Sequence, residues 1–348
     1  MTRKYADLMP MMDSSGKNYY KRKFDIDGIG VMYGKMEKHF MEDRMNNKEI
    51  ECAIDLAEKM SVPCHSNYNG KFDYNHSDRL ESIKNELRNS QYKLFKENSY
   101  FLLFGKKTLE EIDERVLVIS SHVDCLQDKK VFERKMESIH GIFDNAITNA
   151  ACLYLMKYCE MPDNVIFVFT GDEEDKSRGA KHLIRYLKKN SILFNTIVLD
   201  VTYSGYEFGA DFTIENDFIY KNQKKWIKRI IKCAIDSKFK WKFIQADTDQ
   251  KSDNPEEYYK SEKIQKKLKK EDESALSFED NGFEEAWDDE SYMYDKHDIS
   301  CFSLCLPCDA EFTCTEGDMH DPKGFGVRIT NFVNYIAILY ELSRISVE

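Results

Sequence analysis

The chain has 348 residues, of which 42% are hydrophobic and 13% aromatic, and its formal net charge is -11. A chain of this length and composition can bury a full core in one large domain or two smaller ones, which excludes disorder throughout. The acidic balance argues against nucleic acid and anionic membranes as main partners, because both bind basic protein faces.

Neither a targeting segment nor a membrane span is visible. The N-terminal stretch "MTRKYADLMPMMDSSGK" has no apolar run long enough for a signal peptide, and no later stretch reaches the roughly 20 apolar residues of a membrane helix. We therefore expect a cytoplasmic protein that makes no membrane contact.

The chain contains ten cysteines, and in the cytoplasm they are most simply thiols outside disulfides. Cys301, Cys305, Cys308 and Cys314 could together form a structural zinc site. The stretch "ISCFSLCLPC" is nevertheless typical of an apolar strand, which favours buried thiols because cysteine often behaves as a small hydrophobic residue.

The first part of the chain predicts an arm, a helix and a hairpin. Residues 1–23 are polar and rich in Lys and Tyr, and we expect a loose N-terminal arm followed by one domain over residues 24–348. "NKEIECAIDLAEKM" has apolar residues at helical spacing, and "QYKLFKENSYFLLFG" predicts two strands that turn near Lys96 to Asn98.

Strands and helices then alternate. "RVLVISS", "NVIFVFT" and "FNTIVLD" predict strands, and "NAITNAACLYLMKYC" and "GAKHLIRYLKKN" predict the helices between them. These strands are continuous runs of β-branched and aromatic residues, as expected where helices cover both faces of a sheet. The fold class is therefore α/β, with a mixed, largely parallel central sheet.

The last part of the chain contains a change of composition. "KKWIKRIIKCAI" predicts a helix and "FKWKFIQA" a strand, after which residues 247–289 become so highly charged that we expect a solvated insertion. "DISCFSLCLP" then predicts a strand, and "FGVRITNFVNYIAILYEL" predicts one long closing helix. No internal repeat is visible.

Acidic and histidine side chains collect where the predicted strands end. The stretch "TGDEED" sets four acidic residues in a row directly after a strand, a costly arrangement near a core unless a cation neutralises it. In "SSHVD", His122 could bind a metal through one ring nitrogen while Asp124 approaches the other nitrogen and fixes the tautomer. The other candidates are Asp144 in "GIFDN", Glu173 and Glu174 in "TGDEED", Asp200 in "IVLD" and His320 in "EGDMHD".

Each candidate also has a simpler interpretation. A lone histidine usually forms ordinary hydrogen bonds, and Asp144 or Asp200 could cap a helix or a turn. Their combination carries more weight, because the loops at the carboxyl edge of a parallel sheet are where such folds bind ligands.

The set of motifs resembles the co-catalytic dizinc exopeptidase clan. The motifs "SSHVD", "FDNA", "FTGDEEDKSRGA", "VLDVT" and the late "MH" follow one another in the clan's order, and the resemblance covers about Val116 to Glu341. The clan includes leucyl aminopeptidase and aminopeptidase Y-like enzymes, acylase and carboxypeptidase G-like enzymes, and tetrahedral aminopeptidases. By spacing, the leucyl aminopeptidase branch fits best, since the interval from His122 to Asp144 is too short for the tetrahedral branch's inserted dimerisation domain.

The resemblance implies a role for each candidate within a zinc-peptidase-like catalytic domain. Asp144 would bridge two zinc ions, which cobalt or manganese could replace; His122 and Asp200 would complete one site, and Glu174 and His320 the other. Glu173 would be the general base, while Asp172 and Asp175 would face solvent. A small helper motif is matched loosely by Asp289 or Glu290.

The expected function is hydrolysis of an amide bond, with a peptide or small amide as the substrate. The resemblance favours a zinc-dependent aminopeptidase, and the alternatives are an amidohydrolase or dipeptidase acting on N-acyl amino acids or small peptides, and a non-catalytic clan member. We expect the loops at residues 203–208 and 289–294 to select the substrate. The preferred side chain and the oligomeric state are left open.

Overall fold

The computed structural model describes residues 47–203, parts of 205–245, residues 290–309 and 323–347, and three short strands nearer the N-terminus. The predicted charged insertion at 247–289 lies outside the described residues. So does the predicted arm at 1–23, apart from β1 (Met11–Met12) and β2 (Asn18–Tyr19), which pair antiparallel with each other. Among the described residues, no helix is both long and apolar enough to cross a membrane.

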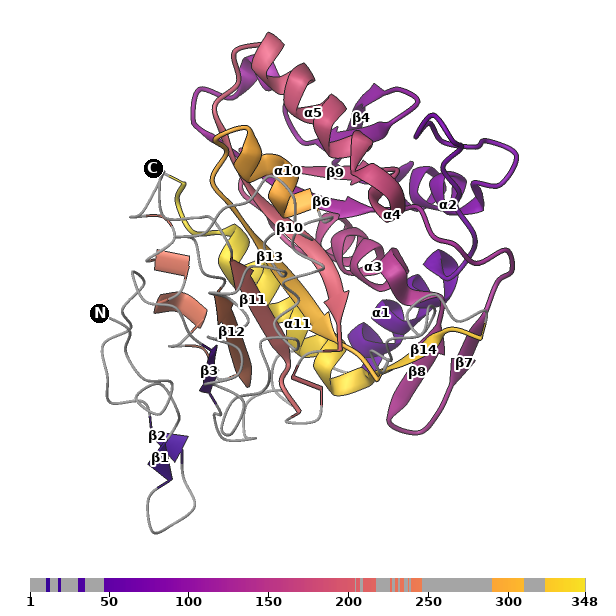
Figure 1. Cartoon of the computed structure of the whole chain (residues 1–348), viewed down its shortest axis with the longest axis vertical. Coiled ribbons are helices and arrows are strands. Elements are labelled where there is room, and N and C mark those ends of the chain that lie inside the picture. Colours follow the sequence, from indigo (N-terminus) through magenta and orange to yellow (C-terminus); the bar gives the residue numbers. More distant parts are fainter. Residues whose placement is uncertain are drawn as a thin grey trace, which may run out of the picture.

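A nine-stranded sheet forms the centre of the described part of the chain (Figure 1). Its strand order is β3-β12-β11-β13-β10-β6-β9-β5-β4. The strands are β3 (Val31–Gly34), β4 (Lys93–Glu97), β5 (Phe101–Gly105), β6 (Val116–His122), β9 (Val165–Thr170), β10 (Phe194–Thr202), β11 (Phe212–Asn216), β12 (Trp241–Gln245) and β13 (Cys301–Pro307).

The centre of this sheet is parallel and its margins contain antiparallel pairs. Strands β13, β10, β6 and β9 run parallel, whereas β5 pairs antiparallel with β9 and β11 pairs antiparallel with β13. The predicted mixed α/β sheet is confirmed, and its carboxyl edge in the parallel centre brings together the ends of β6, β9 and β10.

Helices cover both faces of the sheet (Figure 1). The helices are α1 (Asn47–Met60), α2 (Asp78–Leu87), α3 (Phe143–Tyr158), α4 (Glu173–Lys176), α5 (Arg178–Lys189), α10 (Glu290–Lys296) and α11 (Ile329–Ser343), with a 3-10 turn at Leu109–Glu111. Residues of α1, α2, α3 and α11 share one hydrophobic cluster, and residues of α5 and α10 belong to a second.

The first four residues of β6, Val116 to Ile119, are all apolar because the strand is buried on both faces. Leu117 and Ile119 belong to the first cluster, whereas Val116 and Val118 belong to the second. Because successive side chains of a strand point to opposite faces, these four residues are buried on both faces of the sheet and do not alternate with polar residues.

The predicted long closing helix is wrong at its N-terminal end. Phe325–Arg328 forms strand β14, which pairs antiparallel with β8 (Ser138–Gly141), and β7 (Phe132–Arg134) completes a three-stranded sheet. The side chains of Phe325 and Val327 both enter the core, a spacing of two that suits a strand, so the helix begins only at Ile329.

The predicted hairpin is confirmed, with its turn slightly later than expected. Strands β4 and β5 pair antiparallel, and the Asn98 side chain accepts hydrogen bonds from the backbone N–H groups of Tyr100 and Phe101. An asparagine that bonds its own backbone two residues on is a common way to close such a turn.

Candidate metal centre

The candidate residues meet at the carboxyl edge of the central strands. His122 is the last residue of β6 and lies beside Thr170, the last residue of β9. Asp200 lies near the end of β10, on the other side of β6. Glu173 opens the short helix α4 directly after β9, so the parallel register brings residues far apart in sequence to one place.

Three acidic side chains surround one nitrogen of the His122 ring. Its Nε2 atom lies 3.0 Å from Asp144 Oδ1, 3.7 Å from Asp200 Oδ1 and 3.7 Å from Glu173 Oε2. His122, Asp144 and Asp200 each offer a ligand atom, and these atoms lie within 4.8 Å of one another. Ligands about 2.0–2.2 Å from a zinc ion have this mutual spacing, so the group fits a cation.

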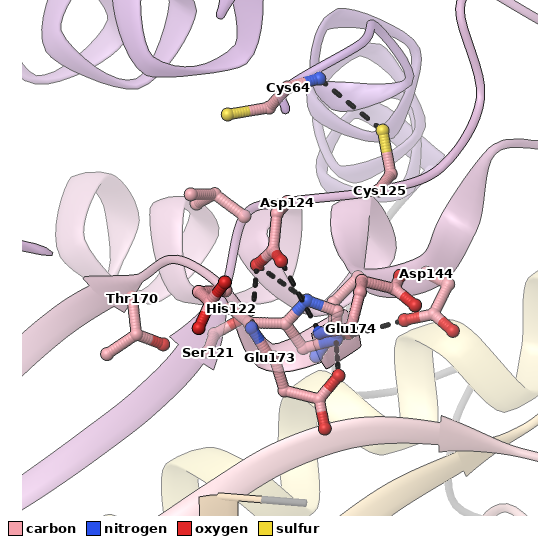
Figure 2. A network of polar contacts seen from close by, with 12 residues as sticks. Cys64, Ser121, His122, Asp124, Cys125, Asp144, Thr170, Glu173 and Glu174 are labelled. Atoms are coloured by element: carbon pink, nitrogen blue, oxygen red, sulfur yellow. Dashed lines mark hydrogen bonds and ion pairs between the residues drawn. The ribbon is translucent and has the colours of Figure 1, made fainter. Parts of the chain in front are cut away.

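Asp124 contacts the opposite side of the same ring (Figure 2). Its Oδ1 atom lies 3.5 Å from His122 Nδ1, as expected of a carboxylate that fixes the tautomer of a metal-binding histidine. The same carboxylate accepts hydrogen bonds from the backbone N–H groups of Glu173, at 3.3 Å, and Glu174, at 3.4 Å. Asp124 therefore orients both the histidine and the first turn of α4.

Helix α3 ties together the strands that supply the ligands. The Asn145 side chain donates to the carbonyl of Leu199, next to Asp200, at 2.6 Å. One turn later, the Asn149 side chain donates to the carbonyl of His122 at 2.7 Å. The backbone of Asp144 is not helical, and its carboxylate faces the site, where Oδ1 lies 3.0 Å from His122 Nε2.

The electrostatics of the cluster suit a cation. Burial raises the pKa values of Glu173, Glu174 and Asp200, and neighbouring carboxylates raise them further. Burial alone would lower the pKa of His122, but the Glu173 charge and its other acidic neighbours hold this pKa well above its ordinary value. These carboxyls are costly to ionise together, and a bound divalent cation would remove that cost.

The expectation that Asp172 faces solvent is wrong. Its side chain is buried, and its two oxygens accept hydrogen bonds from Arg178, one of them from Nη2 at 2.8 Å. Asp175 is half-exposed, as expected, and bonds the same guanidinium at 2.6 Å. Arg178 thus supplies the charge that makes a buried Asp172 tolerable immediately before Glu173.

Glu290 is a buried acid that the sequence indicated only loosely. Its carboxylate accepts hydrogen bonds from Ser120 Oγ, at 2.6 Å, and from Thr170 Oγ1, while Tyr294 donates to Ser120 Oγ at 3.0 Å. Burial raises the pKa of Glu290 to about 7. Asp289, the other residue of that loose match, lies outside the described residues.

Two further expectations concern residues near the site. His320 lies outside the described residues, so its role stays a prediction. The stretch at 289–294 does not form a loop where it is described, because Glu290–Lys296 forms helix α10 and the Tyr294 side chain is fully buried. Tyr206 lies in the loop after β10, and the guanidinium carbon of Arg328, at the end of β14, stacks 4.0 Å from the centre of its ring.

The alternative zinc site of four cysteines finds no support. The nine described cysteines are all thiols, and Cys301, Cys305 and Cys308 lie buried along or just after β13. The group of possible metal ligands found in the described part of the chain is the one at His122. Cys314 lies outside the described residues.

Comparison with known proteins identifies a peptidase family whose model matches this chain. The model of peptidase family M28 matches residues 104–291, which is more than half of the chain. The match contains His122, Asp124, Asp144, Glu173, Glu174 and Asp200. A search of curated proteins finds no match.

Solved structures show the same fold at low sequence identity. LapA of Legionella pneumophila is 11% identical with a TM-score of 0.52, over 89% of this chain and 79% of that chain. Aminopeptidase APDkam598 of the archaeon Desulfurococcus kamchatkensis is 12% identical with a TM-score of 0.51, over 86% of this chain and 94% of that one. The TET1 peptidase of Pyrococcus horikoshii is 10% identical with a TM-score of 0.51, over 85% and 99%.

Proposed function

Because the chain belongs to peptidase family M28, we propose that it is a zinc-dependent aminopeptidase that hydrolyses the first peptide bond of peptides with an unblocked N-terminus. Family membership confirms the expected metallo-exopeptidase and its clan. The observation that carries the proposal is the convergence of His122, Asp144 and Asp200 on one point, with Glu173 beside them.

Two zinc ions are the proposed cofactor. His122 Nε2, Asp144 and Asp200 would hold one ion, and Asp144, Glu174 and His320 would hold the other. Bound zinc would polarise the scissile carbonyl and lower the pKa of the attacking water. Cobalt or manganese could take the same oxygen and nitrogen ligands.

The protein's own groups would position and move the proton. Glu173 Oε2 lies 3.7 Å from His122 Nε2, at the edge of the ligand group, so this carboxylate can accept a proton from the attacking water and pass it to the leaving amine nitrogen. Asp124 keeps the Nδ1 proton on His122 and, through two backbone N–H groups, holds α4 and its two glutamates in place.

A matched set of substrates tests this proposal. The purified chain, loaded with zinc, should release p-nitroaniline from leucine p-nitroanilide and leave the N-acetylated form of that compound intact, because an aminopeptidase requires the unblocked amine. Preferential hydrolysis of N-acetyl-leucine would indicate the amidohydrolase alternative, and preferential hydrolysis of leucyl-glycine would indicate a dipeptidase. No hydrolysis of any of them by the zinc-loaded chain would contradict the proposal.

A further inference from the structure

Arg79, on helix α2, is a fully buried cation close to the candidate metal centre. No carboxylate of the described residues forms an ion pair with it, which is unusual because buried arginines are rarely found without an acidic partner. Its guanidinium instead donates hydrogen bonds to four backbone carbonyls.

Two of these carbonyls lie at the C-terminal end of α1 and just after it. Arg79 Nε donates to Met60 O at 3.0 Å and to Val62 O at 3.1 Å. The other two belong to segments that carry proposed metal ligands: Nη1 donates to Val123 O at 2.9 Å, and Nη2 donates to Ile142 O at 3.4 Å. One planar group therefore joins three stretches of chain.

The Val123 contact fixes the peptide unit between His122 and Asp124. The N–H of Val123 donates to Thr170 O at 2.8 Å, which holds one side of the residue to β9. Arg79 holds the other side through the carbonyl, and this carbonyl belongs to the peptide that enters Asp124. The direction in which Asp124 leaves the strand is thus set from both sides.

The Ile142 contact likewise fixes the backbone from both sides, two residues before Asp144. The N–H of Ile142 donates to Ser61 Oγ at 2.9 Å, and its carbonyl accepts from Arg79. Ser61 lies between Met60 and Val62, the two residues whose carbonyls Arg79 also binds, so Ser61 holds one side of Ile142 and Arg79 the other. Gly141 lies directly before it, where an added Cβ would come within 2.4 Å of Ser61 Oγ.

We propose that Arg79, together with Ser61, is a positioning residue that sets the His122–Asp124 and Ile142–Asp144 segments at the separation zinc requires. The inference rests on the proposed function, because it presupposes the metal centre. Residues that orient metal ligands from behind typically change metal affinity by about 10- to 100-fold when they are replaced.

The Arg79 charge itself acts in the opposite direction. A buried cation repels zinc, so removing the charge alone would tighten zinc binding. Arg79→Lys separates the two effects, because a lysine keeps the charge but presents a single ammonium that cannot span carbonyls on three segments. Weaker zinc binding by this variant therefore reports lost positioning.

The test is a titration of the metal-free chain with zinc, in competition with a chromophoric chelator. The matched control is Leu80→Ala, which loosens the same helix at a buried residue without a polar contact to the site. We expect Arg79→Lys to bind zinc at least about tenfold more weakly than the unchanged chain. Leu80→Ala should lower the melting temperature yet keep the unchanged chain's zinc affinity.

Each other outcome has a defined meaning. Zinc affinity of Arg79→Lys equal to or tighter than that of the unchanged chain would overturn the inference, as would an equal loss in Leu80→Ala, which would show that affinity merely follows stability. If the unchanged chain bound no zinc, the proposed function would fall together with the inference. If Arg79→Lys did not fold, Ser61→Ala would take its place: a smaller loss of zinc affinity is expected, and no loss would overturn the inference.

Discussion

Glu173 and Glu174 are neighbours in the chain, yet their proposed roles differ. Both backbone N–H groups are held by the carboxylate of Asp124, and both side chains have pKa values raised first by burial. Glu173 Oε2 lies 3.7 Å from His122 Nε2, close enough to the proposed metal ligands for proton transfer with the attacking water. Replacing each glutamate by glutamine distinguishes catalysis from metal binding.

Glu173→Gln should lower turnover by a factor of about 10² to 10⁴, because the amide keeps the shape but cannot accept the proton. Zinc content should be unchanged. Glu174→Gln is the matched variant and should lose zinc, since a neutral amide is a poorer ligand than a carboxylate. Zinc analysis and steady-state kinetics on both variants check this, and the reverse pattern would mean that the two roles are exchanged.

The raised pKa of Glu290 predicts that the free energy of unfolding depends on pH. Its pKa of about 7 in the folded chain lies above the value of 4.5 for an ordinary glutamate, so the folded chain retains this proton while the unfolded chain has lost it. The contribution of Glu290 to the free energy of unfolding therefore falls as pH rises from about 4.5 to about 7, by about 3 kcal/mol in total, and then stays level.

Glu290→Gln should remove that part of the pH dependence. Urea unfolding at pH 5 and pH 8, with a chelator present in both cases, measures the loss of stability for each chain. The loss on going to pH 8 should be smaller in the variant, and an identical loss would show that Glu290 does not hold its proton in the folded chain.

Sequence patterns predicted the candidate metal ligands more readily than they predicted the residues that hold those ligands in place. His122, Asp144, Glu173 and Asp200 follow apolar strands or open helices, and such positions are visible without a structure. Arg79 and Asn149 act through backbone carbonyls of distant segments, and a polar residue within a helix carries no sign of such a partner. Asp172 was misplaced because its partner, Arg178, is recognisable only once the turn is folded.

At the scale of elements, the strands of the parallel centre were predictable because their burial on both faces leaves continuous apolar runs. The junction of β14 and α11 was not, since the apolar residues of "FGVRITNF" fit a helical spacing as well as an alternating one. Helix α10 was also missed: it directly follows the highly charged residues, and its buried face includes a glutamate. Partner strands and buried acids are properties of the tertiary structure.

The contacts of Arg178 in the turn between β9 and α4 predict that replacing it lowers both stability and turnover. Its guanidinium pairs with the buried Asp172 and also donates to the Tyr68 carbonyl at 3.1 Å, so it fastens the start of α4 to the neighbouring loop. Arg178→Met should lower the free energy of unfolding by about 3–5 kcal/mol, because it leaves the Asp172 charge buried without its partner. Turnover should also fall, because Glu173 follows Asp172 directly.

Arg115→Met is a suitable control for this prediction. Arg115 precedes β6, at the opposite edge of the sheet, and contacts Phe194 O and Asn195 Oδ1 at 3.4 Å. Chemical denaturation and kinetics should show a small loss of stability and no loss of turnover in the control. If Arg178→Met left both quantities unchanged, the turn would not depend on this ion pair.

At the scale of the whole molecule, the candidate metal ligands and the proposed general base lie together at one edge of the sheet. The ends of β6 and β10, the start of α3 and the short helix α4 bring their side chains to that edge, and α2 supports it from behind through Arg79. The fold is shared with peptidases only 10–12% identical in sequence, which shows how little of the sequence the architecture requires. The proposed metal centre at this edge would hold two zinc ions.

A zinc titration of the metal-free chain, followed by zinc content per chain and by hydrolysis of leucine p-nitroanilide, tests that centre most directly. We predict that zinc content levels off at two ions per chain and that activity, absent from the metal-free chain, reaches its maximum with the second ion. Full activity in the metal-free chain, or tight binding of no more than one ion under zinc-replete conditions, would contradict it.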